Sequence, residues 1–180
     1  MQFNSSKDDD APSDPLFLPQ NYQFTKAYGI LKSYGIYEAI NSIQIILSNA
    51  NGNSIEEYTG PGEYLSLYFN VSDVSVSNGQ VSLPSGTYTI SEYPTLPLTI
   101  WKSSYSYFTL LDASNNRTSY TLTEGSVTID GISGKYSING HLKGYDTEFT
   151  FEFEGIITSP SPVITPQMKL TEATVEYSNQ

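Results

Sequence analysis

The sequence contains no cysteine and only one histidine, two methionines and one tryptophan among 180 residues. Without cysteine the chain can form neither a disulfide framework nor a thiolate metal site. One histidine would leave carboxylates to supply every other ligand of a zinc ion, whereas zinc sites rely on His and Cys together. We therefore expect no metal site and no cofactor.

Basic residues are also scarce, because 8 Lys and Arg face 19 Asp and Glu, which gives a net charge of −11. Nucleic acid binds basic faces, so this charge argues against nucleic acid as a partner. It also argues against adsorption to anionic lipid. No run of about 18 apolar residues is present to span a bilayer, and no cationic-then-apolar signal peptide is present. We expect a cytosolic protein or the mature, trimmed form of a secreted one.

Catalytic motifs are similarly sparse. His141 is the only candidate general base, but it alternates out of step with Tyr136 and Ile138 and should face solvent. Glu152 and Glu154 share one strand face at roughly 7 Å, a spacing compatible with glycoside hydrolysis. Such a row of carboxylates is equally typical of any solvated strand face. No Gly-x-Ser-x-Gly motif supports a serine nucleophile. We predict that the protein is not an enzyme.

What the chain has in abundance is period-two alternation, which is clearest over residues 124–157. Apolar residues recur at every second position, and alternation of this kind places one set of side chains on one face of a strand. Turn residues at 131–134 and 144–146 separate the runs. We predict three consecutive antiparallel strands whose buried face carries Val127, Ile129, Tyr136, Ile138, Leu142, Phe149, Phe151 and Phe153.

The same alternation predicts strands elsewhere. In 63–72 it assigns Leu65, Leu67, Phe69 and Val71 to the core. Residues 34–47 fit a short helix or a strand, and the β-branched residues favour a strand. Further strands are predicted at 22–32, with a bulge at Gly29, and at 87–93, 99–111, 120–122 and 168–177, while 74–80 is a connection or a short strand.

About nine or ten short strands predict an all-β fold, an antiparallel meander that closes into a barrel or a two-sheet sandwich. Residues 1–20 are polar, acidic and proline-bearing, which is typical of a flexible tether. Residues 21–180 are long enough for a single domain. We expect this division of the chain.

Two groups of motifs then carry a resemblance. Ser5–Asp10 reads SSKDDD, which resembles the export signal that follows the lipidated Cys of Bacteroidetes surface lipoproteins. LPSGTY, GKYSINGHL and FTFEFEG resemble small all-β lipoproteins of unknown function from gut members of that phylum, some of which have a calycin-like barrel. The resemblance implies the outer-membrane cell surface and a lipid anchor on a Cys that this chain lacks. We expect a chain trimmed at its cleavage site, with residues near Met1 from cloning.

Aromatic residues suggest where a ligand would bind. Trp101, Tyr105 and Tyr107 share one parity, and Tyr93 precedes a Pro94–Pro97 loop that suggests a rim. Exposed aromatic rings can stack on sugars, so these four residues are our candidate ligand-binding site. The alternative is that this face is the core and that Ile100, Phe108 and Leu110 lie outside, or that both faces are covered.

Two function classes remain open. The first is a non-enzymatic cell-surface domain that binds a glycan or another ligand. The second is a calycin-like carrier or inhibitor that holds a small apolar ligand or peptide inside a barrel. A packed interior with aromatic residues outside favours the first, and an apolar cavity of several hundred Å³ favours the second.

Overall fold

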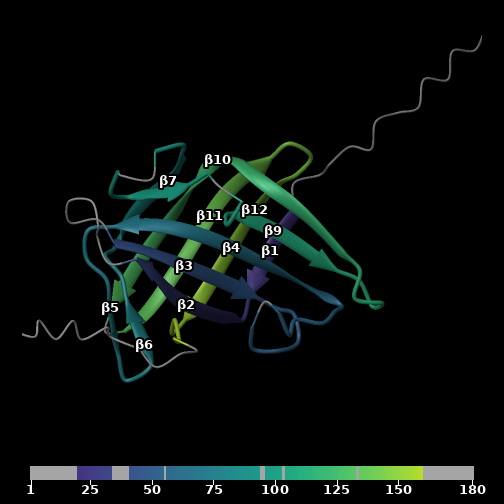
Figure 1. Cartoon of the computed structure of the whole chain (residues 1–180), viewed down its shortest axis with the longest axis horizontal. Coiled ribbons are helices and arrows are strands. Elements are labelled where there is room, and N and C mark those ends of the chain that lie inside the picture. The colour runs from purple at the N-terminus through teal and green to yellow at the C-terminus, as the bar shows by residue number, and fades with distance from the viewer. Residues whose placement is uncertain are drawn as a thin grey trace, which may run out of the picture.

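The chain is all-β, as its alternation predicts (Figure 1). The structure is a computed structural model that describes residues 20–33, 41–54, 56–93, 96–102, 104–132 and 134–159. The strands are β1 (Gln20–Phe24), β2 (Lys26–Ser33), β3 (Asn41–Ser48), β4 (Gly62–Val71), β5 (Ser75–Ser77), β6 (Gln80–Ser82), β7 (Gly86–Ser91), β8 (Thr99–Trp101), β9 (Tyr107–Leu111), β10 (Arg117–Ile132), β11 (Lys135–Gly144) and β12 (Glu148–Gly155). Within these ranges there is no helix.

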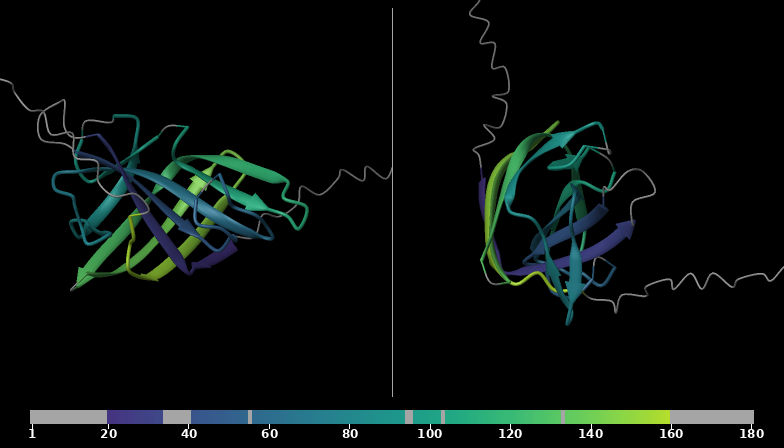
Figure 2. Two further views of the ribbon diagram at one scale, coloured as in Figure 1. Left: turned by 60° about the horizontal axis from the view of Figure 1, so that its bottom comes forward. Right: turned by 90° about the vertical axis from the view of Figure 1, so that its left-hand side faces the viewer.

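A closed ring of five strands forms a small barrel. The long strand β10 pairs with β9 along its first part and with β7 along its later part, and both β8 and β9 pair with β4. The parallel pair β7–β8 completes the ring. Strands β11, β12 and β1 extend the sheet beyond β10, and β3 and β2 extend it beyond β4. Figure 2 shows β2–β4 and β10–β12 wrapping around the same interior.

The predicted meander over 124–157 is confirmed. Strand β10 pairs antiparallel with β11, and β11 pairs antiparallel with β12. Every apolar residue that we assigned to its buried face is at most 5% exposed. Gly125 follows a register shift of β10 between Leu122 and Glu124, its φ is +125°, and a Cβ there would approach the His141 carbonyl oxygen to 2.2 Å. Only glycine fits this position.

The single strand predicted over 22–32 is wrong in one respect, because the chain breaks at Thr25 and its faces reverse there. Phe24 and Ala27 are both buried in the interior, although their parity differs. Tyr28 therefore faces outward. The Asn49 side chain bridges the break, since its Oδ1 accepts hydrogen bonds from Thr25 N and Oγ1, both at 3.0 Å.

Before the break, β1 pairs in parallel with β12, and after it β2 pairs antiparallel with β3. The register irregularity of β2 lies between Leu31 and Ser33, not at the predicted Gly29. Gly29 N donates to the Thr158 carbonyl at 2.8 Å, and Thr158 N donates to the Ala27 carbonyl at 3.1 Å. The chain that follows β12 thus meets β2.

The predicted strand over 99–111 is two strands, β8 and β9. They pair with different parts of β4, so the intervening residues must leave the sheet. Ser106 stabilises this detour: its hydroxyl donates to the Trp101 carbonyl at 2.7 Å and accepts from Tyr68 N at 3.1 Å. A side chain replaces the strand neighbour that Tyr68 would otherwise need.

The segment over 74–80 begins a hairpin, β5–β6, whose turn contains Asn78 and Gly79 with φ at +51° and +72°. Positive φ at both positions is typical of a two-residue hairpin turn. Two strand pairs, β1–β12 and β7–β8, are parallel within this otherwise antiparallel arrangement. Residues 1–19 of the predicted tether (1–20), residues 34–40 of the helix-or-strand segment (34–47) and the strand predicted at 168–177 lie outside the described residues. Gln20 begins β1, and residues 41–47 belong to the strand β3.

Side chains pack the interior between the two sides of the sheet. Phe108 lies near its centre, with its ring centroid 4.8 Å from that of Tyr22 and 4.5 Å from that of Phe149. The core residues predicted in 63–72 are at most 1% exposed. The opposite face of β4 is largely buried too, since Tyr64, Ser66 and Asn70 are at most 2% exposed.

Candidate functional site

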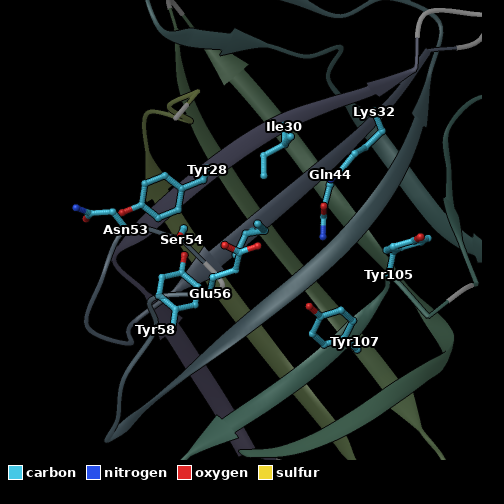
Figure 3. A pocket seen from close by; sticks show the side chains of 11 residues that line it. Tyr28, Ile30, Lys32, Gln44, Asn53, Ser54, Glu56, Tyr58, Tyr105 and Tyr107 are labelled. Atoms are coloured by element: carbon cyan, nitrogen blue, oxygen red, sulfur yellow. The ribbon is translucent and has the colours of Figure 1, made fainter. Parts of the chain in front are cut away.

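A second, smaller apolar cluster covers the outward face of β2, β3 and β4. Ile45 and Leu47 of β3 face the interior, whereas Ile46 between them belongs to this outer cluster. Here the structure forms a hollow of about 330 Å³. Its lining comprises Tyr28, Ile30, Lys32, Gln44, Ile46, Asn53, Ser54, Glu56, Tyr58, Tyr105 and Tyr107. Figure 3 shows Tyr28, Glu56 and Tyr58 on one side of the hollow and Tyr105 and Tyr107 on the other.

Tyrosine rings build the walls of this hollow. Tyr58 packs on Tyr64 at 5.1 Å between ring centroids, and Tyr64 packs edge-on against Tyr107 at 6.1 Å. Aromatic pairs with such geometry are favourable beyond the area they bury. The walls are therefore held in place before any ligand arrives.

A hydrogen-bonded chain of polar groups forms part of the floor. Gln44 Nε2 donates to Ser66 Oγ at 2.8 Å, and Ser66 Oγ donates to the Tyr105 carbonyl at 2.7 Å. Gln44 and Ser66 are both buried. Because buried polar groups with partners are stable, this chain fixes β3, β4 and the segment before β9 relative to one another.

The loop between β3 and β4 contributes Glu56 and Tyr58 and is tied to β2. Lys26 Nζ donates to the Ala50 carbonyl at 2.9 Å and lies 3.5 Å from the Gly52 carbonyl. Burial raises the pKa of Tyr58 and that of Tyr107, each to about 12. Both phenols are therefore uncharged at neutral pH and can donate a hydrogen bond.

The structure separates the four sequence-predicted site residues. Tyr105 and Tyr107 line the hollow. Trp101 is half-buried and packs edge-on against Tyr68 at 5.6 Å between ring centroids, and Tyr105 also packs on Tyr68, at 5.8 Å. Tyr93 is 67% exposed and does not belong to the lining. The predicted strip on one regular strand is thus replaced by a cluster around Tyr68.

The alternative orientation of this face is not what the structure has. Ile100 and Phe108 are at most 1% exposed and belong to the interior. Tyr105, by contrast, is 51% exposed on the opposite side. Aromatic residues therefore do gather outside the barrel.

Sequence reasoning missed Tyr28, Tyr58, Tyr64 and Tyr68. The sequence held a signal for three of them. Tyr28 shares the parity of Ile30, and Tyr64 shares the parity of Tyr68, in each case on the strand face opposite to an apolar run. Tyr58 had none, since it lies in a loop.

The carboxylates and the histidine that we weighed as catalytic lie elsewhere. His141 is exposed and its Nε2 is 2.9 Å from Glu148 Oε1, which is an ordinary surface pair. Glu152 and Glu154 are exposed on β12 beside a separate depression that they share with Gln23, Phe24 and Thr25. In the part of the chain that the structure describes, no group of three His, Asp or Glu could hold a metal ion.

The described ranges also contain no helix that is long and apolar enough to cross a membrane. Comparisons with protein-family models, with curated proteins and with solved structures found no match to this chain.

Proposed function

We propose that this protein is a non-enzymatic, cell-surface binding domain that holds a glycan or a similar small ligand in the tyrosine-lined hollow. The observation that carries the proposal is the combination of a packed interior with an aromatic hollow outside it. Binding sites are concave, largely apolar and supplied with a few convergent polar groups. The hollow has this character, because tyrosine rings form its walls and Gln44 and Tyr107 add polar groups to its lining.

The packed interior supports surface binding over the carrier alternative. A carrier holds its ligand within the barrel, where this structure has the buried side chains of Phe69, Phe108 and Phe149. The rings of Phe108 and Phe149 lie 4.5 Å apart between centroids. The hollow lies on the other face of the same strands. A ligand can reach it without displacing the core.

The location belongs to the same proposal. We propose a lipid-anchored protein of the outer-membrane surface, on the resemblance of SSKDDD and of the all-β body to Bacteroidetes surface lipoproteins. The described domain would then face outward at the end of an acidic tether. Protease shaving of intact cells that express the full-length gene tests the location, and complete protection of the domain would contradict it.

Binding itself can be tested with a panel of neutral oligosaccharides, read by intrinsic fluorescence and by calorimetric titration. Tyr105 lines the hollow and is 51% exposed, so Tyr105→Ala should fold normally and weaken binding. The matched control is Tyr145→Ala, because Tyr145 is 81% exposed and lies outside the lining. Equal affinities of the two variants would place the site elsewhere.

A further inference from the structure

We propose that the Gln44 side-chain amide is the polar anchor of the hollow, and that its Oε1 accepts a hydrogen bond from a hydroxyl of a neutral saccharide ring. This inference rests on the proposed binding function and names its ligand class and its specificity-determining residue. Three features of the described residues carry it: an acceptor oxygen without a partner, an orientation fixed by a neighbouring serine, and a lining that suits an uncharged ring.

The first feature is the oxygen itself. Gln44 is only 4% exposed, and it lines the hollow. Its Nε2 donates to Ser66 Oγ at 2.8 Å, while no described residue donates to its Oε1. Among the described residues, the Tyr58 hydroxyl is the one polar side-chain atom that is both unpartnered and closed off from solvent, so Gln44 Oε1 must reach solvent. Because Gln44 borders the hollow, a ligand there can meet this oxygen.

The second feature is the orientation of the amide. A serine hydroxyl has a single proton, and that of Ser66 goes to the Tyr105 carbonyl at 2.7 Å. Ser66 therefore accepts from Gln44, which requires that the amide nitrogen face Ser66 and that the oxygen point away from it. In Figure 3 the Gln44 amide points toward the middle of the hollow, as the Tyr107 hydroxyl does. Because the acceptor is already held in place, a bond to it costs little side-chain entropy.

The third feature is the lining. Its one cation, Lys32, and its one anion, Glu56, are both exposed and balance each other, so the lining carries no net charge. Burial raises the pKa of Tyr107 to about 12, so this phenol is uncharged and can donate a hydrogen bond. An amide acceptor beside a neutral phenol fits a neutral ligand whose groups both donate and accept, as hydroxyls do. A sugar ring carries such hydroxyls, and its C–H face can lie on tyrosine walls.

The test first removes the acceptor from the protein. In Gln44→Met an unbranched apolar side chain replaces the amide, and Ser66 keeps its bond to the Tyr105 carbonyl. The variant should weaken saccharide binding by about 2- to 13-fold, the range of one neutral hydrogen bond. The matched control is Asn70→Leu, because Asn70 is a buried amide of β4 outside the lining, whose Nδ2 donates to Thr99 Oγ1 at 3.0 Å. It should lower the melting temperature and keep wild-type affinity.

A second measurement removes the donor from the ligand. The probes are D-glucose, D-galactose, D-mannose and lactose, followed by the monodeoxyfluoro analogues of the sugar that binds best. Fluorine cannot donate a hydrogen bond, so one analogue should leave Oε1 unsatisfied and bind wild-type protein at least about 5-fold more weakly. In Gln44→Met the same analogue should bind as well as its parent sugar. Such coupling would not arise if Gln44 only supported the fold.

A loss of affinity at one hydroxyl that disappears in Gln44→Met supports the inference. Sugar binding at wild-type strength in Gln44→Met, or a fluorine penalty that persists in it, overturns the anchor and leaves the proposed function standing. If Gln44→Met does not fold, fluorinated analogues that all match their parent sugar on wild-type protein still overturn the anchor.

Zwitterionic amino acids and a linear alkanol are the comparison arms. A preference of wild-type protein for either of them over the sugars overturns the ligand class. Failure of wild-type protein to bind any member of the panel overturns both the inference and the proposed function.

Discussion

The Asn49 side chain hydrogen-bonds to Thr25 in the way that the backbone of a neighbouring strand would. Its Oδ1 accepts from both the amide and the hydroxyl of Thr25 at 3.0 Å, and its Nδ2 donates to the Gln23 carbonyl at 2.8 Å. These hydrogen bonds supply partners for the backbone amide of Thr25 and the carbonyl of Gln23, where β1 ends and β2 begins. The faces reverse at this point, and Tyr28 therefore faces outward and lines the hollow.

Asn49→Ala should therefore destabilise the fold. The substitution removes hydrogen bonds at an exposed break, where water can replace the lost partner, so we expect a loss of about 0.5–1.5 kcal/mol in the free energy of unfolding. Urea denaturation measures it. The control is Asn139→Ala on the exposed face of β11, which should change stability by less than about 0.5 kcal/mol. Equal midpoints for the two variants would show that Asn49 is dispensable.

The centre of the interior gives a second prediction. Phe108 contacts Tyr22 and Phe149 and is 1% exposed. Phe108→Ala should cost about 3–5 kcal/mol, because it removes a large apolar side chain and leaves a cavity. Chemical denaturation tests this value, with Ile132→Ala as the control since Ile132 is 79% exposed. A loss below about 1 kcal/mol would mean that the interior is loosely packed, contrary to the argument against a carrier.

Alternation along each strand was enough to predict the fold class and most of the core, because it depends only on neighbouring residues. Phe149, Phe151 and Phe153 are buried as their spacing requires. The break at Thr25 could not be read in this way, since it depends on the side chain of Asn49, a residue distant in sequence. The division of 99–111 also depends on which parts of β4 its two ends meet.

The candidate site was predicted only in part for the same reason. Tyr105 and Tyr107 were found because aromatic residues recur locally, but their partners come from other strands and from a loop. Which strands are neighbours is decided by non-local pairing, and a one-residue change of parity moves a side chain to the other face. Tyr58 could be recognised only once the loop between β3 and β4 was placed.

Buried tyrosines give a prediction about alkaline pH. Burial raises the pKa values of Tyr58, Tyr88 and Tyr107 from 10.0 to about 12. Between these values the unfolded chain has lost protons that the folded chain retains, so the free energy of unfolding falls as pH rises. The stabilisation should be complete below pH 10 and should disappear through about pH 12.

Urea midpoints across this range, together with phenolate absorbance, test the prediction. Tyr107→Phe should remove one late-titrating phenol and make the decline shallower. A midpoint that stays constant as the pH rises from about 10 to about 12 would contradict the assignment of these three phenols as buried and neutral.

The last prediction concerns the lone tryptophan. Trp101 is half-buried, and the Tyr68 ring packs edge-on against it, with 5.6 Å between the ring centroids and an interplanar angle of 72°. Its emission should lie between that of a core tryptophan and that of a solvated one, and acrylamide should quench it moderately. Tyr68→Ala removes this wall, so the emission should shift to longer wavelength and quenching should increase. Tyr120→Ala is the control, because Tyr120 is also half-buried but its ring contacts Phe108. A blue-shifted emission that acrylamide does not reach would place Trp101 in the core, and the residue would then be removed from the candidate site.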